Sequence, residues 1–356
     1  MKTLNLKHSS GAYEILIEKG IFNNLNENIS NIDYDNLFII TDQNVYDLYK
    51  EKIKKLDFKK IIKILPGEKS KSFETYKKVC NLLLSSNITR SDLIITLGGG
   101  VVGDLGGFVA ATLLRGIKFV QVPTTLLSQV DSSIGGKVAI NANGGKNLVG
   151  NFYQPVKVII DPEFLLTLDF REIKSGLGEL IKHSLIKDNK LFDSLLNYSN
   201  FDDLYKNIED ILYDSLKVKK DVVQKDEYDK SIRMILNFGH TIGHAIEKKL
   251  KVNEISHGEA VAIGMLEITK ISEKKGLTKK NTSKKIYKIL KQYGFQIKSF
   301  EMNELVKYIK MDKKILNNKL NLILLKDIGK AYIKEIKLKR LENFLGVDYE
   351  KNNKEK

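Results

Sequence analysis

The first 170 residues repeat one pattern of hydrophobic and polar positions. A short apolar run is followed by a polar or glycine-rich loop and then by an amphipathic segment, as in NLFIITDQNVYDLYKEKI and SDLIITLGGGVVGDLGGFVAATLL. Short apolar strands that alternate with helices are typical of a parallel sheet covered on both faces. The sequence therefore predicts an α/β, Rossmann-like domain over residues 1–170. Its first element is expected to be a hairpin that turns at Ser9–Gly11.

The pattern changes at about residue 171, where apolar positions begin to recur with the 3.6-residue period of a helix. A mostly α-helical domain is expected over residues 171–356, with one late hairpin between KLNLILL and AYIKEIK. Its expected helical segments are 171–187, 201–225, 232–250, 258–275, 283–293 and 301–309.

Polar loops follow four predicted strands of the first domain. In a parallel sheet the carboxyl ends of the strands meet at one edge, and ligands bind there. We therefore expect the loops at 42–44, 66–71, 98–104 and 123–125 to share that edge.

Composition narrows the classes of partner. The net charge is +15, and residues 277–356 hold 20 Lys and 1 Arg against 9 acidic residues. These lysines are scattered over helical segments without a nucleic-acid motif, so we expect a solvated surface and no nucleic-acid partner. No apolar run approaches the roughly 20 residues that span a membrane. Because the N-terminus lacks a secretory apolar core and Cys80 is the single cysteine, a cytoplasmic protein without a membrane partner is expected.

The strand DLIITL runs directly into residues 98–103, GGGVVG, which have the spacing G-x-G-x-x-G. Glycines at such a turn let backbone amides approach a diphosphate, and the helix that starts there favours an anion. Because no G-K-[ST] follows, NAD fits better than a nucleoside triphosphate. Asp42, at the end of an earlier strand, is a candidate for holding a ribose hydroxyl. The alternative is a tight strand-to-helix turn that serves close packing alone.

Four of the five histidines lie in the second half of the chain. Glu179 and His183 are four residues apart, as are His240 and His244, and His257 begins another helix. Residues i and i+4 share a helix face, and histidine with carboxylate suits Zn²⁺ or a similar divalent ion. Spacing alone favours the pair His240 and His244 and does not decide which three side chains are ligands.

Charged residues among glycines suggest a binding segment. The stretch QVDSSIGGKVAINANGGKNLVG combines small and chargeable residues and is predicted to be a flexible binding loop. Lysine and arginine pair with phosphate and carboxylate groups, so cations gathered at one site would suit a substrate with two anionic groups. Taken singly, the later candidates, from Lys219 onward, are better explained as surface residues. The candidates are Asp131, Lys137, Lys146, Asn147, Lys219, Arg233, Asn237 and the lysines of MDKK.

Six blocks of sequence closely resemble the 3-dehydroquinate synthase family, and the match runs in order over roughly residues 35–330. They are GGGVVGDLGGF, RGIKFVQVPTTLLSQVDSSIGGKVAIN, GKNLVGNFYQP, SGLGELIKH, LNFGHTIGHAIE and HGEAVAIGM. The resemblance implies a dehydroquinate synthase-like fold and the conversion of 3-deoxy-D-arabino-heptulosonate 7-phosphate to 3-dehydroquinate and phosphate. That is the second step of the shikimate route to chorismate and the aromatic amino acids. It also implies NAD, Zn²⁺ or Co²⁺, and a homodimer.

By the family's motifs, the metal ligands would be Glu179, His240 and His257, and His244 would serve the substrate or proton transfer. The other catalytic residues implied are Asp131, Lys182, Lys219, Arg233 and Asn237. The substrate would also meet Lys137, Lys146, Asn147, one of Lys313 and Lys314, with Lys313 preferred, and Arg115 from a neighbouring subunit. NAD would contact Asp42, Asn44, Glu68, Lys71, Gly99, Gly100, Val101, Val102, Gly103, Asp104, Thr124, Thr125, Lys137, Lys146, Phe164 and Thr167.

The resemblance also implies the course of the reaction. A substrate hydroxyl is oxidised by NAD⁺, phosphate leaves by β-elimination, the same NADH reduces the ketone, and an intramolecular aldol addition closes the ring. Three alternatives remain: a related sugar-phosphate cyclase, a metal-dependent polyol dehydrogenase that releases NADH, and a non-catalytic nucleotide- or polyanion-binding protein.

Overall fold

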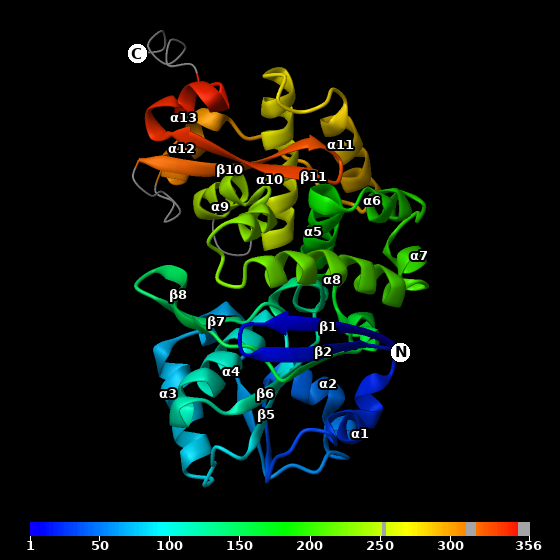
Figure 1. Cartoon of the computed structure of the whole chain (residues 1–356), viewed down its shortest axis with the longest axis vertical. Coiled ribbons are helices and arrows are strands. Elements are labelled where there is room, and N and C mark those ends of the chain that lie inside the picture. The colour runs from blue at the N-terminus through cyan, green and yellow to red at the C-terminus, as the bar shows by residue number, and fades with distance from the viewer. Residues whose placement is uncertain (251–253, 311–317, 348–356) are drawn as a thin grey trace. The chain divides into compact units, whose positions relative to one another are not determined.

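The chain folds into two compact units, seen here in a computed structural model that describes residues 1–250, 254–310 and 318–347 (Figure 1). Unit 1 consists of Met1–Asp169 together with Ile208–Tyr228. Unit 2 consists of Phe170–Asn207 and Asp229–Lys356. The chain therefore leaves the first unit, returns to it for one segment, and leaves it again.

Unit 1 is built on a seven-stranded sheet in the order β1-β2-β9-β6-β5-β3-β4. Strands β1 and β2 form the predicted antiparallel hairpin, and the other neighbours pair in parallel. The α/β prediction for this part is confirmed. The strands are β1 (Lys2–His8), β2 (Gly11–Ile17), β3 (Leu37–Asp42), β4 (Lys60–Ile64), β5 (Leu93–Gly98), β6 (Lys118–Pro123) and β9 (Lys157–Ile160).

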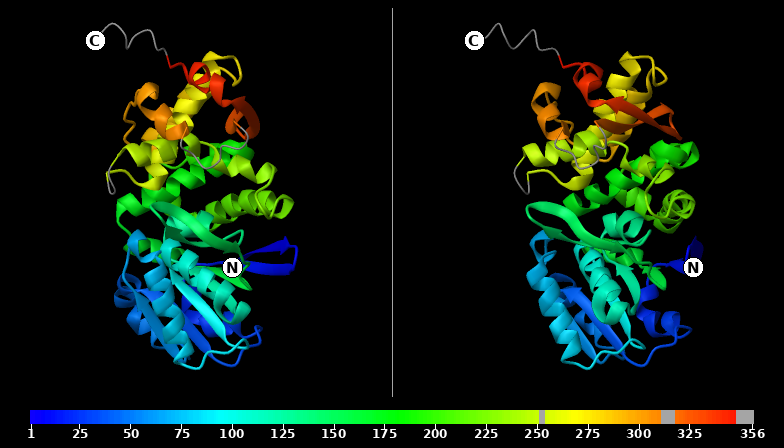
Figure 2. Two further views of the ribbon diagram at one scale, coloured as in Figure 1. Left: turned by 90° about the vertical axis from the view of Figure 1, so that its left-hand side faces the viewer. Right: turned by 60° about the vertical axis from the view of Figure 1, so that its left-hand side comes forward.

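Helices cover both faces of this sheet because successive strand residues point to opposite sides. On β3, Phe38 and Ile40 join one buried cluster with α3 (Phe73–Leu84) and α4 (Gly100–Thr112), whereas Leu37 and Ile39 join another. The second cluster includes α1 (Leu25–Ile29) and α2 (Gln43–Ile53). Figure 2 shows the sheet between helices on its two sides.

Helix α8 (Ile208–Lys225) belongs to unit 1 although it follows unit 2 segments in the chain. The backbone N–H of Lys19 donates to the Glu209 carboxylate at 2.7 Å, and Lys2 pairs with Asp210. The expected domains, 1–170 and 171–356, place the boundary one residue later than that between Asp169 and Phe170, and they do not include this return segment. A single cut in the chain does not describe the two units, because α8 packs against β1 and β2.

Two predicted loops of unit 1 are regular structure. Residues 42–44 are not a loop, because α2 begins at Gln43 and the Asp42 carboxylate caps it by accepting from the Val45 N–H at 3.0 Å. The predicted flexible stretch after Asp131 is an antiparallel hairpin, β7 (Lys137–Ala142) and β8 (Gly145–Phe152), preceded by the short helix η4 (Ser128–Ser132). Buried side chains of β7 anchor this hairpin in the core beneath α4.

Unit 2 is mostly helical, as the sequence predicts, and ends in the expected hairpin of β10 (Lys319–Asp327) and β11 (Lys330–Lys337). The predicted segment 201–225 breaks at residues 206–207, and α6 and α13 were not predicted. None of the helices among the described residues is long and apolar enough to cross a membrane. The helices are α5 (Phe170–Lys187), α6 (Asn189–Leu196), α7 (Phe201–Tyr205), α9 (His240–Lys249), α10 (His257–Lys274), α11 (Thr282–Gln292), α12 (Met302–Lys310) and α13 (Leu338–Leu345).

Gly107 tests the packing of the hairpin beneath α4. A Cβ there would overlap the side chain of Val138 on β7. We expect Gly107→Ala to lower the free energy of unfolding by about 1–3 kcal/mol, as overpacking does. In chemical denaturation, Val138→Ala should lower the free energy of unfolding by less in the Gly107→Ala background than in the wild-type chain. Strictly additive effects of the two substitutions would contradict this contact.

Candidate functional site

Helices α5 and α10 touch through their backbones, and this contact brings Glu179 near His257. A Cβ on Gly258 would overlap the carbonyl of Ser175, and a Cβ on Gly178 would lie 2.5 Å from the Gly258 oxygen. Only glycine permits that approach. The N-terminus of α10 is fixed by a capping box between Ser256 and Glu259, so the position of His257, the first residue of the helix, is defined.

Helix α9 reaches α10 in a similar way. Gly239, in the left-handed region with φ 78°, is the residue before α9, and a Cβ there would lie 2.7 Å from the Val261 carbonyl. His240 follows directly and is the first residue of α9. The glycines of SGLGELIKH, NFGHTIGH and HGEAVAIGM thus bring three helices together at the residues that carry the chemistry.

Glu179, His240 and His257 converge on one point. Glu179 Oε1 lies 3.7 Å from Nε2 of His240 and 3.7 Å from Nε2 of His257. Zinc bonds of 2.0–2.2 Å in a tetrahedral site place neighbouring ligand atoms roughly 3.4 Å apart. Glu179 is fully buried, and its Oε1 has no hydrogen-bond partner among the described residues. These residues fit a divalent metal, because an ion would satisfy the buried oxygen and accept both imidazole lone pairs.

The remaining polar atoms of the three side chains are held by neighbours. Lys182, one turn along α5, donates to the other oxygen of Glu179, so the charge of this buried carboxylate is paired. Nδ1 of His240 lies 3.2 Å from the carbonyl oxygen of Phe238. Nδ1 of His257 lies 3.3 Å from Glu247 Oε2. Such contacts orient the imidazoles of metal sites.

Charge around His257 favours its protonated form when no ion is present. Burial disfavours that form, but the hydrogen bond to Glu247 and the charge of Glu179 outweigh it, so the pKa of His257 lies above its ordinary value. Metal binding requires the neutral imidazole, so the ion would displace this proton.

Sequence reasoning missed Glu247. The residue is seven positions after His240 and three after His244, so all three share a face of α9, and this spacing was a usable signal. His244 lies with its ring centroid 5.3 Å from that of His240 and 6.0 Å from that of His257. His244, Glu247 and His257 form a second group with ligand atoms close together, so geometry also allows an alternative donor set.

The glycine turn lies between β5 and α4 in unit 1. Gly99 caps α4 without a side-chain hydrogen bond, so the first amides of this helix are not capped by a side chain at that position. Open N-terminal amides and the helix dipole suit a diphosphate. Packing accounts for Gly103, because a Cβ there would lie 2.7 Å from Gln121 Oε1. Val102 is buried, so its side chain belongs to the core.

Lys71 is the centre of a buried polar network beside the turn. Its Nζ pairs with Asp104 at 2.6 Å and also donates to the side chain of Asn147 on the β8 strand. Asn141 donates to Glu68 at 2.8 Å, and its backbone N–H donates to the Lys71 carbonyl. Burial raises the pKa of Asp104 and the charge of Lys71 opposes that rise. The network joins four residues expected at the dinucleotide or the substrate.

Other expected dinucleotide contacts differ in accessibility. Asp42 uses one carboxylate oxygen as the cap of α2, and burial raises its pKa. Thr125 and Ser128 hydrogen-bond to each other through their hydroxyls at 2.8 Å, and the Thr167 hydroxyl lies 2.7 Å from that of Tyr49. The ring of Phe164 is buried in the core against Phe22 and Tyr49, and its contact with the dinucleotide stays a prediction.

The same edge of the sheet gathers the loops expected there, since β3, β4, β5 and β6 are parallel and end together at Asp42, Ile64, Gly98 and Pro123. The backbone N–H of Thr124 donates to the Gly98 carbonyl at 3.0 Å, which joins two of these loops. Asn44, in the first turn of α2, is exposed, and Val101, in the first turn of α4, is half-buried.

The expected substrate residues divide between the two units. In unit 1, Lys219 of α8 pairs with Asp131 at 2.7 Å. Lys137, Lys146 and Arg115 are exposed. In unit 2, Arg233 is buried and Asn237 is half-buried in the short helix η6 (Ile232–Asn237) before α9. Lys313 and Lys314 lie outside the described residues.

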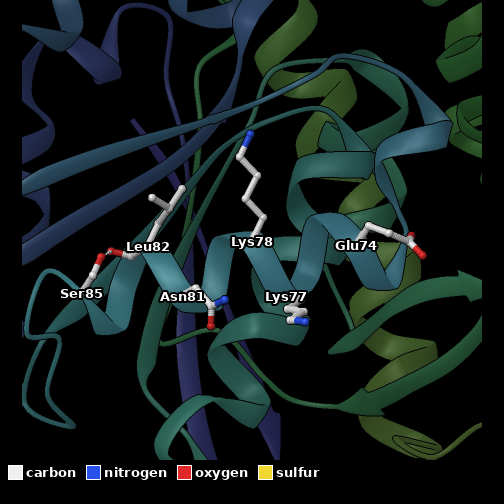
Figure 3. A pocket seen from close by; sticks show the side chains of 6 residues that line it. All are labelled: Glu74, Lys77, Lys78, Asn81, Leu82 and Ser85. Carbon is white, nitrogen blue, oxygen red and sulfur yellow. Dashed lines mark hydrogen bonds between the residues drawn. The ribbon is translucent and has the colours of Figure 1, made fainter.

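A surface hollow elsewhere contains none of these residues. It is lined by Glu74, Lys77, Lys78, Asn81, Leu82 and Ser85, all from α3 and the residue that follows it (Figure 3). The chemistry-bearing groups described above therefore lie elsewhere.

Comparison with known proteins identifies relatives over nearly the whole chain. Family models described as 3-dehydroquinate synthase N-terminal and C-terminal match residues 61–175 and 176–315. A 3-dehydroquinate synthase of Clostridium acetobutylicum is 47% identical over 98% of this chain and 100% of that relative. Another, from Clostridium perfringens strain 13, is 51% identical over 94% of this chain and 97% of that relative.

Solved structures share the fold. A 2-deoxy-scyllo-inosose synthase in complex with carbaglucose-6-phosphate, NAD⁺ and Co²⁺ matches with a TM-score of 0.84 and 26% identity, covering 97% of this chain and 99% of that one. A 2-epi-5-epi-valiolone synthase from Streptomyces hygroscopicus subsp. jinggangensis, with NAD⁺ and Zn²⁺ bound, matches with a TM-score of 0.83 and 24% identity, covering 97% and 98%. The second likeness shows the fold alone.

Gly258 tests the helix contact that assembles the site. We expect Gly258→Ala to separate α5 from α10, to weaken Zn²⁺ binding at least about tenfold, as loss of ligand support does, and to lower the unfolding temperature. Zinc titration of the metal-free protein measures the first effect. The control is Lys274→Ala, an exposed position later on α10. Wild-type zinc affinity in a folded Gly258→Ala variant would contradict the assembly described here.

Proposed function

The chain belongs to the 3-dehydroquinate synthase family, and we propose how its residues carry out the reaction of that family. The reaction converts 3-deoxy-D-arabino-heptulosonate 7-phosphate to 3-dehydroquinate and phosphate, with NAD and Zn²⁺ or Co²⁺ as cofactors. The single observation that carries the assignment of the site is the buried Glu179 oxygen that faces two imidazoles.

We assign Glu179, His240 and His257 as the metal ligands. When bound, the divalent ion would act as a Lewis acid that lowers the pKa of a substrate hydroxyl. Lys182 neutralises the second oxygen of Glu179, which leaves Oε1 to face the site. Its ammonium group is also a donor for a substrate oxygen. This arrangement favours the metal over a hydrogen-bonded apo structure, because Oε1 finds no other partner among the described side chains.

His244 is proposed to hold or move a proton of the substrate. It stands between the first turn of α9 and Glu247, and its ring lies beside both ligand imidazoles. A neutral imidazole accepts a proton at one nitrogen and donates one from the other. Asp131 is proposed to hold a substrate hydroxyl. Its pairing with Lys219 keeps one carboxylate oxygen oriented and supplies a cation beside it.

The dinucleotide is proposed to bind at the carboxyl edge of the unit 1 sheet. NAD⁺, when bound, would take a hydride from the substrate and later return it. The open amides at the start of α4 suit the diphosphate, and the Asp42 oxygen that does not cap α2 suits a ribose hydroxyl. Further residues of the proposed set border this edge: Glu68, Lys71, Asp104, Thr124 and Thr125. We propose that the remaining members make contact through backbone atoms or the outer atoms of their side chains: Asn44, Val101, Val102, Phe164 and Thr167.

The substrate carries a phosphate and a carboxylate, which call for cations and amides. We propose that Lys137, Lys146, Asn147, Lys219, Arg233 and Asn237 hold these two groups, with Lys313 as a further candidate outside the described residues. Planar guanidinium and amide groups pair with carboxylate and phosphate oxygens. The reaction requires no covalent bond between substrate and protein, so these contacts serve mainly to orient the substrate.

Two related activities are disfavoured. The inosose and valiolone synthases share the fold at 26% and 24% identity, against 47% and 51% for the dehydroquinate synthases. A glycerol dehydrogenase from Schizosaccharomyces pombe matches at 14% identity with a TM-score of 0.62, which indicates a common fold alone. Higher identity over nearly the full chain supports the dehydroquinate synthase reaction.

We also propose a homodimer in the cytoplasm, with Arg115 reaching the site of the neighbouring subunit and without a nucleic-acid partner. Arg115 supports such a reach because its side chain is exposed and it ends the short helical turn after α4, with φ 68°. The single cysteine supports a reducing compartment.

The function is tested by supplying purified protein with the heptulosonate phosphate, Zn²⁺ and NAD⁺ at less than the substrate concentration. We expect many turnovers of phosphate release without net NADH absorbance, because the cofactor is regenerated. His257→Ala should lose bound zinc and at least about 99% of turnover, as loss of a metal ligand and its Lewis acid implies. Accumulating NADH would indicate a dehydrogenase, and turnover only with a sugar phosphate lacking the carboxylate would indicate a sibling cyclase.

Asp42 tests the dinucleotide assignment. Asp42→Ala should weaken NAD binding by about 10–100-fold, the loss expected for a charge-assisted hydrogen bond, while zinc content stays unchanged. Because the variant also loses the cap of α2, Ser72→Ala is the control: Ser72 caps α3 through the Thr75 N–H in the same way. If isothermal titration gave both variants the wild-type NAD affinity, the ribose contact would be wrong.

A further inference from the structure

Glu247 is joined to the site through His257. Its Oε2 lies 3.3 Å from His257 Nδ1, while Nε2 of the same ring lies 3.7 Å from Glu179 Oε1. We propose that Glu247 is a positioning residue that fixes the ring orientation and tautomer of His257, so that the Nε2 lone pair faces the metal. This inference rests on the metal site proposed above.

His257 needs such a partner more than His240 does. Nδ1 of His240 is held by the backbone carbonyl of Phe238, which no substitution of a side chain removes. His257 is the first residue of α10, and its side chain is 31% exposed. The capping box of Ser256 and Glu259 fixes the backbone there but leaves the χ angles of His257 undetermined. Among the described residues, the Glu247 carboxylate lies against Nδ1 at 3.3 Å, so it sets those angles.

The hydrogen bond also selects the tautomer. A carboxylate is an acceptor, so Glu247 keeps the proton of the neutral imidazole on Nδ1 and leaves the lone pair on Nε2. Nε2 is the nitrogen directed at Glu179. The carboxylate also makes the imidazole a stronger electron donor, as outer partners of ligating histidines do. Orientation and donor strength both favour metal binding through Nε2.

Helix α9 therefore supplies a ligand and the support of another ligand. His240 and Glu247 are seven residues apart, two turns along one face, and both face α10. A shift of α9 along α10 would move the ligand His240 and the partner of His257 together. The positions of the two imidazoles therefore both depend on α9, which is one rigid helix.

Charge adds to this effect. Lys182 pairs with Glu179 and offsets part of its charge. Glu247 adds a second negative charge, 3.3 Å from Nδ1 of His257. Removing that charge should weaken attraction for a divalent cation even where a hydrogen-bond acceptor remains, so glutamine and alanine at this position are expected to differ.

The alternative for Glu247 is direct ligation. His244, Glu247 and His257 also form a close group of donors, in which His257 would ligate through another arrangement. Cobalt distinguishes the two roles, because the intensity and position of its visible bands report coordination number and ligand type. A positioning residue leaves the bands nearly unchanged once the site is filled, whereas loss of a ligand changes them.

The test uses full-length protein freed of metal by a chelator and then titrated with Zn²⁺ against a chromophoric competitor. We expect Glu247→Ala to weaken zinc binding about 10–100-fold, the range seen for such outer partners. Glu247→Gln, which keeps an acceptor without the charge, should lose less. The Co²⁺ spectra of both loaded variants should match that of the wild-type protein.

The matched control is Glu267→Ala. Glu267 is 18% exposed, close to the 19% of Glu247, and pairs with Lys270 at 2.7 Å. It lies ten residues beyond His257 on α10, roughly 15 Å along the axis. We expect its zinc affinity to equal that of the wild-type protein. Thermal unfolding of the metal-free variants checks that each one folds.

Four results would overturn the inference. One is wild-type zinc affinity in folded Glu247→Ala, and another is an equal loss in the Glu267→Ala control, which would show a non-specific effect. The third is a changed Co²⁺ spectrum, which would make Glu247 a ligand. The fourth is a glutamine variant no better than alanine. The proposed function fails separately: if Glu179→Gln left zinc affinity unchanged, the metal site itself would be wrong, whatever Glu247 does.

Discussion

The metal site assigned to unit 2 depends on a carboxylate oxygen, Oε1 of Glu179, that is buried and has no hydrogen-bond partner among the described residues. An unsatisfied buried acceptor costs about 1–3 kcal/mol, and more when the group is charged. Lys182 pairs with one oxygen of Glu179 and leaves Oε1 directed at two imidazoles. A bound divalent cation would supply the missing partner, so metal binding would also stabilise the packing of α5, α9 and α10. The stability of this unit and its chemistry therefore depend on the same atoms.

Glycine has two different uses in this chain, and the difference explains why motif reading alone is ambiguous. Gly258 and Gly239 permit close helix contacts that place His257 and His240, so the motif glycines of unit 2 act through packing. In unit 1, Gly103 packs on Gln121, whereas Gly99 starts a helix without a side-chain cap. The spacing G-x-G-x-x-G therefore combines a packing position with a turn whose amides are available to an anion.

Much of the fold was predictable, because local patterns determine it. Alternation of apolar runs and amphipathic segments predicted the parallel sheet, and the 3.6-residue period predicted α5, α9 and α10. The sequence could not show that α8 returns to unit 1, since its partners on β1 and β2 lie some 200 residues earlier in the chain. Asp42 has the sequence of a loop but caps a helix. Spacing places Glu247 on the helix face of His240, but its contact with His257, which lies on a different helix, does not follow from periodicity.

The expected dinucleotide residues already bind one another, and this has a consequence for affinity. Lys71 is buried against Asp104 and Asn147, and Asn141 ties the same loop to Glu68. These contacts hold the loop after β4, the start of α4 and the β7–β8 hairpin in one arrangement before any ligand arrives. Less ordering is then required on binding, which favours affinity. A ligand anion that approached Lys71 would compete with the Asp104 carboxylate for its ammonium group. Affinity is therefore highest for an anion that binds nearby and leaves the ion pair between Lys71 and Asp104 intact.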